Sequence, residues 1–520
     1  MIRLHSSPAR AALRLTLGLL LFAAAYAIIN NRLLVQSILY RAAANDFESA
    51  AFALLGFTIQ GLALLLAVAL LPRRLFALLL ALVAVSALVN ITYADIVRDT
   101  IDLARMSWLL GESRQAGEAA GQFAGAALIA ALKTAIAVAL LWSARLTLRP
   151  LLRAKVHRAK HLLPLLLAVL APSFVAIGPP AAERNIYRYT AEILTAPPPP
   201  PREAVTAVPD STRQIEKIVW LIDESISHAA FAKLVRPRLT RFDPVDFGEA
   251  AAIANCSSPA HVGLRSGLEV RRITPATDLR RAPTIWAYAR KAGYRTMLID
   301  GQVTGPPQNM MLPTERVLID EYRAAAAGLR TDYEMARMLN AELRQPGKQF
   351  VYAVLRGVHF QYSDHYPEGL IPADSSVTAQ YEAAVAYSRR GLFDALLAGV
   401  DRERVAILYT SDHGQNVREG VMPHCSEDPD AAEFSIPLIA FLPRERAAPY
   451  AHAPKHGRSA SQIFPTTLEW MGYDPAYAHA RYDRDLHQST ARYVWLGRSV
   501  LPTRSGEEID LHRESGFPGR

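Results

Sequence analysis

The sequence predicts an α-helical transmembrane bundle of five helices, followed by an α/β domain in which helices flank a mostly parallel sheet. Apolar residues crowd into the first third of the 520-residue chain, a proline run covers Pro197–Pro201, and short apolar runs then alternate with helical stretches. We therefore expect a transmembrane domain over 1–180, a linker over 181–214, a globular domain over 215–500 and a polar tail over 501–520.

The composition agrees with a chain that lies partly in a membrane. The chain is 51% hydrophobic and 20% charged, which is apolar for a soluble protein. Its net charge of +9 would suit a nucleic-acid partner. Many of the basic residues, however, lie between apolar segments, and we find no basic patch with interleaved aromatic residues. We therefore expect no nucleic-acid partner.

Five apolar segments are each near the ~20 residues that a helix needs to span a bilayer. They are Leu15–Leu34, Ala51–Leu71, Leu75–Ile96, Phe123–Ala144 and Leu162–Ile177. The first segment has an alternative as a signal peptide, because arginines precede it and a run of alanines lies inside it. The four segments that follow favour an uncleaved first helix.

Basic residues around these segments indicate the cytoplasmic side. They are Arg3, Arg10 and Arg14 before the first segment, Arg73 and Arg74 before the third, and Arg145, Arg149, Arg153, Lys155, Arg158 and Lys160 before the fifth. An odd number of spans then places everything beyond Ile177 outside the cytoplasm. We expect a multi-pass protein of a bacterial inner membrane whose globular domain lies in the periplasm.

Two polar features of the membrane region each have two interpretations. Lys133 lies inside the fourth segment, where a charge is a functional candidate, or its long side chain simply reaches water or a head group. The polar loop from Thr92 to Gln122 predicts amphipathic helices on the outer leaflet. This loop either contacts a lipid or serves only as a connector.

The globular domain shows strands and helices in alternation. Apolar runs typical of buried strands cover Ile218–Ile222, Thr296–Ile299, Phe350–Leu355, Val405–Tyr409 and Ile436–Leu442. Helical stretches cover Thr284–Ala292, Tyr333–Leu343, Ala379–Leu397 and Ala460–Met471. This alternation indicates a mostly parallel sheet between two layers of helices.

Acidic residues and a histidine follow two of these buried strands. Asp223 and Glu224 come directly after the first strand, and Asp412 and His413 come shortly after the fourth. Open α/β sheets place their chemistry beyond the carboxyl ends of strands, and buried carboxylates need a positive partner. Carboxylate oxygens with an imidazole nitrogen suit Zn²⁺. A surface turn that is acidic by chance is the alternative for the first pair.

A third stretch, residues 256–267, has the pattern of a loop that runs into a helix. A hydroxyl at a helix N-terminus lies beside free N–H groups that favour an anion such as a phosphoryl group. Coordination to a metal would activate the hydroxyl as a nucleophile. In the alternative interpretation, Ser257 or Ser258 is an ordinary helix N-cap.

These three stretches occur in the order found in the alkaline phosphatase superfamily, which includes sulfatases and phosphoethanolamine transferases. The segment 222–225 resembles the Gly-Glu-Thr element of phosphoethanolamine transferases, and the segment 411–414 resembles their late metal motif. The nucleophile, proline, basic residue and glycine of the sulfatase signature correspond to Ser257, Pro259, His261 and Gly267. The resemblance implies an alkaline-phosphatase/sulfatase-like fold for the globular domain.

The resemblance also implies a function and a set of site residues. It implies a zinc-dependent phosphoethanolamine transferase that takes its group from phosphatidylethanolamine in the surrounding membrane lipids. The acceptor would be an envelope lipid or glycan, such as lipid A. One zinc ion is expected and a second is left open. The implied metal ligands are Glu224, Ser257, Asp412 and His413, with Asp223 left open.

Three histidine and serine positions carry the implied reaction. Ser257 would form the covalent intermediate. His359, after the strand Phe350–Leu355, and His424, after the Asp-His motif, would hold phosphate oxygens or protonate the leaving group. The alternatives are a sulfatase-like or phosphodiesterase-like hydrolase on the same metal core, and a membrane scaffold without activity.

The sequence departs from this family in two ways that bear on the site. The nucleophile is serine where the family's transferases usually have threonine, and the hydroxyl chemistry is the same. The chain has two cysteines, Cys256 and Cys425, where the family's transferases carry several disulfides. A periplasmic location permits a bond between the two, and two free thiols are the alternative.

Overall fold

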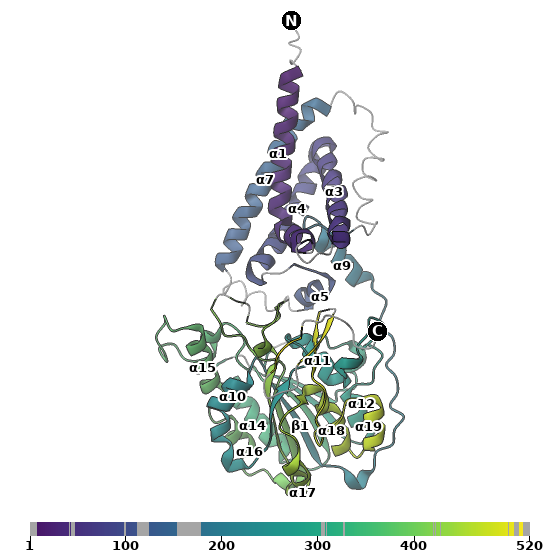
Figure 1. Cartoon of the computed structure of the whole chain (residues 1–520), viewed down its shortest axis with the longest axis vertical. Coiled ribbons are helices and arrows are strands. Elements are labelled where there is room, and N and C mark those ends of the chain that lie inside the picture. The colour runs from purple at the N-terminus through teal and green to yellow at the C-terminus, as the bar shows by residue number, and fades with distance from the viewer. Residues whose placement is uncertain are drawn as a thin grey trace. The chain divides into compact units, whose positions relative to one another are not determined.

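The computed structural model describes residues 8–40, 42, 47–97, 100–111, 124–152, 178–302, 307, 309–325, 328–419, 421, 423–426, 428–497, 499–503 and 509–512. The chain divides into two compact units, Met1–Pro197 and Pro198–Arg520. Figure 1 shows a helical unit and an α/β unit.

The first unit is built from helices. They are α1 (Pro8–Leu34, continued by the π-helical Val35–Tyr40), α3 (Phe47–Leu70), α4 (Arg73–Val97), α5 (Leu103–Gly111), α7 (Ala124–Leu152) and α9 (Asn185–Thr195). Among the described residues, four helices, α1, α3, α4 and α7, are long and apolar enough to cross a membrane. They coincide with four of the five predicted spans. The fifth predicted span, Leu162–Ile177, lies outside the described residues.

The structure shows what Lys133 and the described part of the predicted polar loop contact. Lys133 in α7 donates to both carboxylate oxygens of Asp95 in α4, over 2.9 and 2.7 Å. The positive charge inside the fourth span is therefore paired with a negative one, which reduces the cost of placing it near hydrocarbon. The predicted polar loop contains the short helix α5, which packs against α4 and α9 through Ile101 and Met106.

The second unit contains an eight-stranded sheet in the order β4-β3-β5-β1-β6-β7-β2-β8, within the described residues. Its strands are β1 (Lys217–Asp223), β2 (Val245–Ala251), β3 (Arg295–Asp300), β4 (Glu321–Ala324), β5 (Gln349–Val354), β6 (Val405–Ser411), β7 (Ser435–Phe441) and β8 (Arg458–Ser459). All neighbours pair in parallel except β7, which runs antiparallel to β6 and β2. The prediction of a mostly parallel sheet is confirmed.

Helices cover both faces of this sheet (Figure 1). On one face lie α10 (His228–Leu234), α14 (Thr331–Leu343), α15 (Val377–Ser388) and α16 (Leu392–Leu397). On the other lie α11 (Ser257–Ser266), α12 (Ile285–Lys291), α18 (Ile463–Trp470) and α19 (Pro475–Arg481). Because helices cover both faces, the central strands are buried on both sides. Successive side chains of β1 therefore enter the two cores in turn, with Trp220 in one and Leu221 in the other.

The structure departs from the predicted elements at the edges and at one helix. The predicted helix Ala379–Leu397 is broken into α15 and α16, because Gly391 adopts a left-handed conformation with φ of 73°. The strands β2, β4 and β8 lack long apolar runs, and β2 contains a bulge at Gly248. A hairpin, β9 (Tyr493–Leu496) and β10 (Ser499–Pro502), and the single-turn helices α13 (Pro313–Arg316) and α17 (Arg444–Ala447) complete the unit.

Candidate functional site

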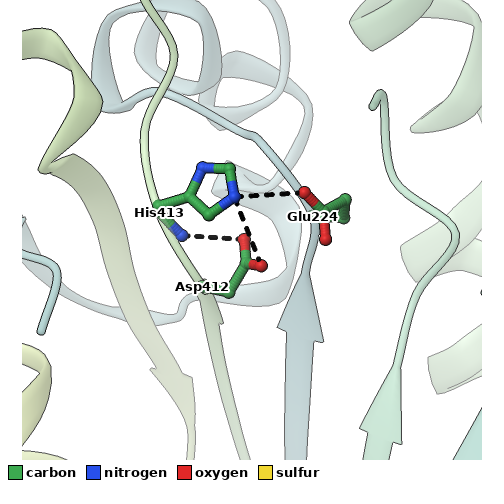
Figure 2. A group of neighbouring side chains, drawn as sticks. All are labelled: Glu224, Asp412 and His413. Carbon is green, nitrogen blue, oxygen red and sulfur yellow. Dashed lines mark hydrogen bonds and ion pairs between the residues drawn. The ribbon is translucent and has the colours of Figure 1, made fainter. Parts of the chain in front are cut away.

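The pairing of two central strands brings the predicted metal ligands together. β1 and β6 are parallel neighbours, and their last paired residues are Asp223 and Ser411. The residues that follow, Glu224 and Asp412 with His413, therefore emerge side by side at one edge of the sheet (Figure 2). The Nε2 atom of His413 lies 3.3 Å from Glu224 Oε1 and 3.6 Å from Asp412 Oδ2. The three side chains are buried and have the spacing of a metal-binding group.

Hydrogen bonds fix the orientation of the Asp412 and His413 side chains. Asp412 Oδ1 accepts from the backbone N–H groups of Ser225 and His413, at 3.2 and 2.7 Å. Its Oδ2 is buried and has no hydrogen-bond partner in the described part of the chain. His413 Nδ1 lies 2.8 Å from the carbonyl oxygen of Gly414, so it carries the proton and leaves the Nε2 lone pair facing the carboxylates. An unpaired carboxylate oxygen and an imidazole lone pair fit a divalent cation such as zinc.

The electrostatics of the group also favour a bound cation. Burial, reinforced by the charge of Glu224, raises the pKa of Asp412 to about 8. Burial alone would lower the pKa of His413, but Asp412 and Glu224 raise it to about 9. The buried carboxylates of Asp412 and Glu224 thus favour a positive charge beside them, and without a metal ion a proton on His413 supplies it. A metal ion would take the place of that proton.

The predicted nucleophile lies against this group. Ser257 is the first residue of α11, where the first N–H groups of the helix have no partner within the helix. Its Oγ donates to Glu224 Oε2 over 3.1 Å and lies 3.2 Å from His413 Nε2. The Ser257 side chain is half-buried, so a substrate can reach it. The site therefore combines a hydroxyl, a ligand group and an anion-binding helix end.

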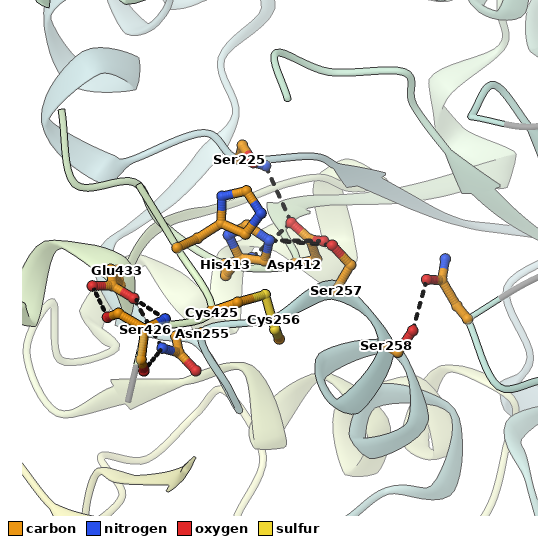
Figure 3. The surroundings of a disulfide bond; sticks show 12 residues. Ser225, Asn255, Cys256, Ser257, Ser258, Asp412, His413, Cys425, Ser426 and Glu433 are labelled. Atoms are coloured by element: carbon orange, nitrogen blue, oxygen red, sulfur yellow. Dashed lines mark hydrogen bonds and ion pairs between the residues drawn. A yellow bond between two sulfur atoms is a disulfide. The ribbon is translucent and has the colours of Figure 1, made fainter. Parts of the chain in front are cut away.

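A disulfide joins the nucleophile to a second loop (Figure 3). Cys256 and Cys425 are bonded, with their Cα atoms 4.8 Å apart. Of the two alternatives left by the sequence, the structure contains the bonded form. Because Cys256 precedes Ser257 and Cys425 follows His424, the bond ties two predicted site residues to each other across 169 residues of sequence.

The two further predicted histidines lie beside His413. The ring of His424 stacks on that of His413 at 4.6 Å between centroids, and the ring of His359 lies 4.9 Å from that of His424. The Gln415 amide is satisfied when its oxygen accepts from Tyr362 and its nitrogen donates to His424 Nδ1 over 3.1 Å. Nε2 of His424 then carries the proton, and burial with the neighbouring His413 lowers the His424 pKa well below its usual value. His424 is thus a neutral hydrogen-bond donor, whereas His359 is exposed.

Asp223 lies next to the group but turns away from it. Its Oδ1 accepts from the backbone N–H of Glu224, and its Oδ2 binds Tyr409 at 2.6 Å and Arg389 at 2.9 Å. Burial raises the pKa of Asp223 to about 6, although Arg389 opposes this. Both oxygens are occupied by other partners, so we leave Asp223 out of the proposed ligand set.

Two residues near the group were not singled out as site residues from the sequence. Gln302 donates to Glu224 Oε2 over 2.8 Å. His261 is fully buried, with Nδ1 2.6 Å from the Tyr352 hydroxyl and Nε2 3.8 Å from Asp412 Oδ2. The position of Gln302 just beyond β3 could have indicated that it lies near the site, because β3 ends at the same edge of the sheet. His261 was noted only as the basic position of the sulfatase signature.

The disulfide predicts a dependence of stability on redox state. Reducing the Cys256–Cys425 bond frees two loops, and loss of a native disulfide typically costs about 2–5 kcal/mol. We expect reductant to lower the melting temperature of the wild-type protein in detergent. A variant with Cys256→Ser and Cys425→Ser should melt at the lower temperature with or without reductant. A wild-type melting temperature that is the same with and without reductant would contradict the presence of this disulfide.

A Gly414 variant tests how the candidate ligand His413 is held. A Cβ atom at Gly414 would lie 2.1 Å from the carbonyl oxygen of Ala432, which is backbone and cannot turn aside. Gly414→Ala should therefore displace His413 and weaken zinc binding by about 10- to 100-fold, as loss of support around a ligand does. Chelator competition measures this. Gly125→Ala, where the added Cβ meets nothing within 4 Å, is the control and should bind zinc as the wild type does.

Comparisons with known proteins agree with this fold. Residues 251–473 match the Sulfatase family model. The integral membrane protein lipooligosaccharide phosphoethanolamine transferase A from Neisseria meningitidis is similar over 91% of this chain and 97% of its own, with 14% identity and a TM-score of 0.50. The C-terminal periplasmic domain of EcEptC from Escherichia coli covers 58% of this chain and 96% of its own, with 18% identity and a TM-score of 0.47.

A structure of the same E. coli domain in complex with Zn covers 57% of this chain and 93% of its own, with 18% identity and a TM-score of 0.45. No curated protein matches the chain in sequence. Residues 251–473 are therefore similar to the Sulfatase family, and the chain shares the fold of the membrane-protein phosphoethanolamine transferase from N. meningitidis.

Proposed function

We propose that this protein is a zinc-dependent phosphoethanolamine transferase anchored in a bacterial inner membrane, with its α/β unit in the periplasm. It takes phosphoethanolamine from phosphatidylethanolamine and passes it to an envelope glycan or glycolipid, such as lipid A. The observation that carries the proposal is the contact of the Ser257 hydroxyl with both Glu224 and His413. The apolar helices support it as well, because the proposed donor is a membrane lipid.

Glu224, Asp412 and His413 would hold the zinc ion, with Ser257 as a further ligand. Two carboxylates, an imidazole and a hydroxyl make a four-coordinate oxygen and nitrogen set that zinc accepts. When bound, zinc lowers the pKa of the serine hydroxyl and offsets negative charge on the phosphoryl group. A second ion beside His359 and His424 stays open.

In the first step, Ser257 Oγ attacks the phosphorus of phosphatidylethanolamine. The Ser257 proton would leave to solvent when the cation binds, because zinc lowers the pKa of the hydroxyl, and the Glu224 carboxylate stays ionised beside Ser257 Oγ. The bond from phosphorus to the diacylglycerol oxygen breaks, and His359, which is exposed, protonates that oxygen. The products are diacylglycerol and phosphoethanolamine esterified to Ser257.

In the second step, an acceptor oxygen attacks the phosphorus and the bond to Ser257 Oγ breaks. His359, which gave up a proton in the first step, takes the acceptor's proton, and Ser257 Oγ leaves as the deprotonated oxygen with which the first step began. In both steps the Nε2–H of His424 and the first N–H groups of α11 donate to phosphoryl oxygens. His359 thus gives one proton in the first step and takes one back in the second, so the cycle closes without a net change at the site.

A sulfatase-like or phosphodiesterase-like hydrolase on the same metal core is the second candidate. The match of the Sulfatase family model to a stretch that includes Ser257 favours it. The two functions differ in what resolves the serine ester. A transferase requires an acceptor alcohol or phosphate, whereas a hydrolase uses water alone.

Ser257→Ala tests the proposed nucleophile. The full-length protein in detergent should release diacylglycerol from a fluorescent phosphatidylethanolamine and gain the mass of one phosphoethanolamine on the peptide that contains Ser257. Ser257→Ala should lower release by at least about 10³-fold, because the covalent route is lost. Ser258→Ala, one residue further along the same helix, is the matched control. Release that persists in folded Ser257→Ala would contradict the proposal.

Metal removal tests the proposed cofactor. Dialysis against EDTA should abolish release by the wild-type protein, since the ligand group then lacks its cation, and one equivalent of Zn²⁺ should restore it. Asp412→Asn keeps the shape of the side chain but removes its charge, so it should need a much higher zinc concentration for the same rate. Full activity of metal-free protein would exclude a metal role.

A further inference from the structure

We infer that Arg389 is a positioning residue that joins the metal-ligand turn after β1 to the His359 loop after β5. The inference rests on a buried network of charges behind the site, which the proposed reaction does not use. Arg389 follows α15 directly, and its side chain is 1% exposed. It forms ion pairs with Asp223 and with Asp332, which come from different parts of the chain.

On one side, Arg389 holds the turn that carries Glu224. Its Nη1 lies 2.9 Å from Asp223 Oδ2, which also accepts from the Tyr409 hydroxyl over 2.6 Å. The other oxygen of Asp223 accepts from the backbone N–H of Glu224 over 3.0 Å. Arg389 thus fixes the carboxylate that fixes the backbone of a proposed zinc ligand.

On the other side, Arg389 holds the loop that carries His359. Its Nη2 donates to Asp332 Oδ2. The Asp332 carboxylate in turn accepts from the backbone N–H groups of Arg356 and Gly357, over 2.6 and 3.2 Å. His359 follows two residues after Gly357, so its loop is set by the same guanidinium.

The two sides also touch each other directly. The N–H of Val358 donates to the carbonyl oxygen of Glu224 over 3.1 Å. Gly357 has a φ of +63°, and a Cβ atom there would lie 2.4 Å from Glu224 Cβ. The loop and the turn are therefore in direct contact beside the site.

A purely structural role is the competing explanation for this network. Buried ion pairs often add little net stability compared with apolar residues of the same volume. Arg389 uses two nitrogens to join two separate carboxylates, each of which holds backbone N–H groups beside the site. A lysine has a single nitrogen and cannot reproduce this geometry. The arrangement therefore fits the control of geometry at the site.

The test separates the two sides of the network in the full-length protein. Zinc affinity is measured by chelator competition, and KM and kcat are measured with fluorescent phosphatidylethanolamine. Tyr409→Phe loosens only the Glu224 side and should weaken zinc binding. Asp332→Asn loosens only the His359 side and should change KM or kcat at saturating zinc while leaving zinc affinity within twofold. Arg389→Lys should do both, with zinc affinity lowered about 10-fold or more.

Arg241→Lys is the matched control, because Arg241 pairs with Asp394 at the surface, where both side chains are more than half exposed (60% and 53%). It should change neither readout. A folded Arg389→Lys protein with a lower melting temperature but wild-type zinc affinity and kinetics would overturn the inference. If Arg389→Lys fails to fold, the Tyr409→Phe and Asp332→Asn variants test the inference instead. Wild-type zinc affinity and wild-type kinetics in both variants would also overturn it. Both arms rest on the metal site of the proposed function, but only the kinetic arm also rests on the proposed donor, so zinc affinity tests Arg389 even if another lipid is the donor.

Discussion

The parallel pairing of β1 with β6 is the constraint on which the site depends. It aligns Asp223 with Ser411, so the chain leaves both strands at the same level and delivers Glu224, Asp412 and His413 to one point. The strands are far apart in sequence, and only the sheet brings their ends together. The two apolar cores keep this register, because a slip of one residue would move the side chains of β1 to the wrong face.

The burial of these charges explains much of the surrounding structure. Carboxylates in a dry site are costly unless they are paired, and the protein surrounds each of them with donors. Glu224 accepts from Ser225, Ser257 and Gln302. Within the described part of the chain, Asp412 Oδ2 and the nearby His261 Nε2 are buried without a hydrogen-bond partner. The disulfide then ties the loop of Ser257 to the loop of His424, so the proposed nucleophile and the proposed phosphate-binding histidine are held together beside the candidate ligand group.

The sequence predicted the parts of this site that follow from local pattern. The apolar runs of β1 and β6, each followed by charged residues, were sufficient to place the proposed ligands at the sheet edge. Local pattern could not show which way a carboxylate turns. Asp223 and Glu224 are adjacent, yet Arg389 and Tyr409 draw the first away from the group. Gln302 reaches Glu224 only through the order of strands, and short edge strands such as β8 leave almost no apolar signal.

Anomalous diffraction at the zinc absorption edge, from crystals of the full-length protein grown with zinc, tests the central claim most directly. The account predicts a peak about 2.0–2.2 Å from a carboxylate oxygen of Glu224, from Asp412 Oδ2 and from His413 Nε2, with Ser257 Oγ beside it. A peak held by other residues, or none at this group in zinc-loaded crystals, would contradict it.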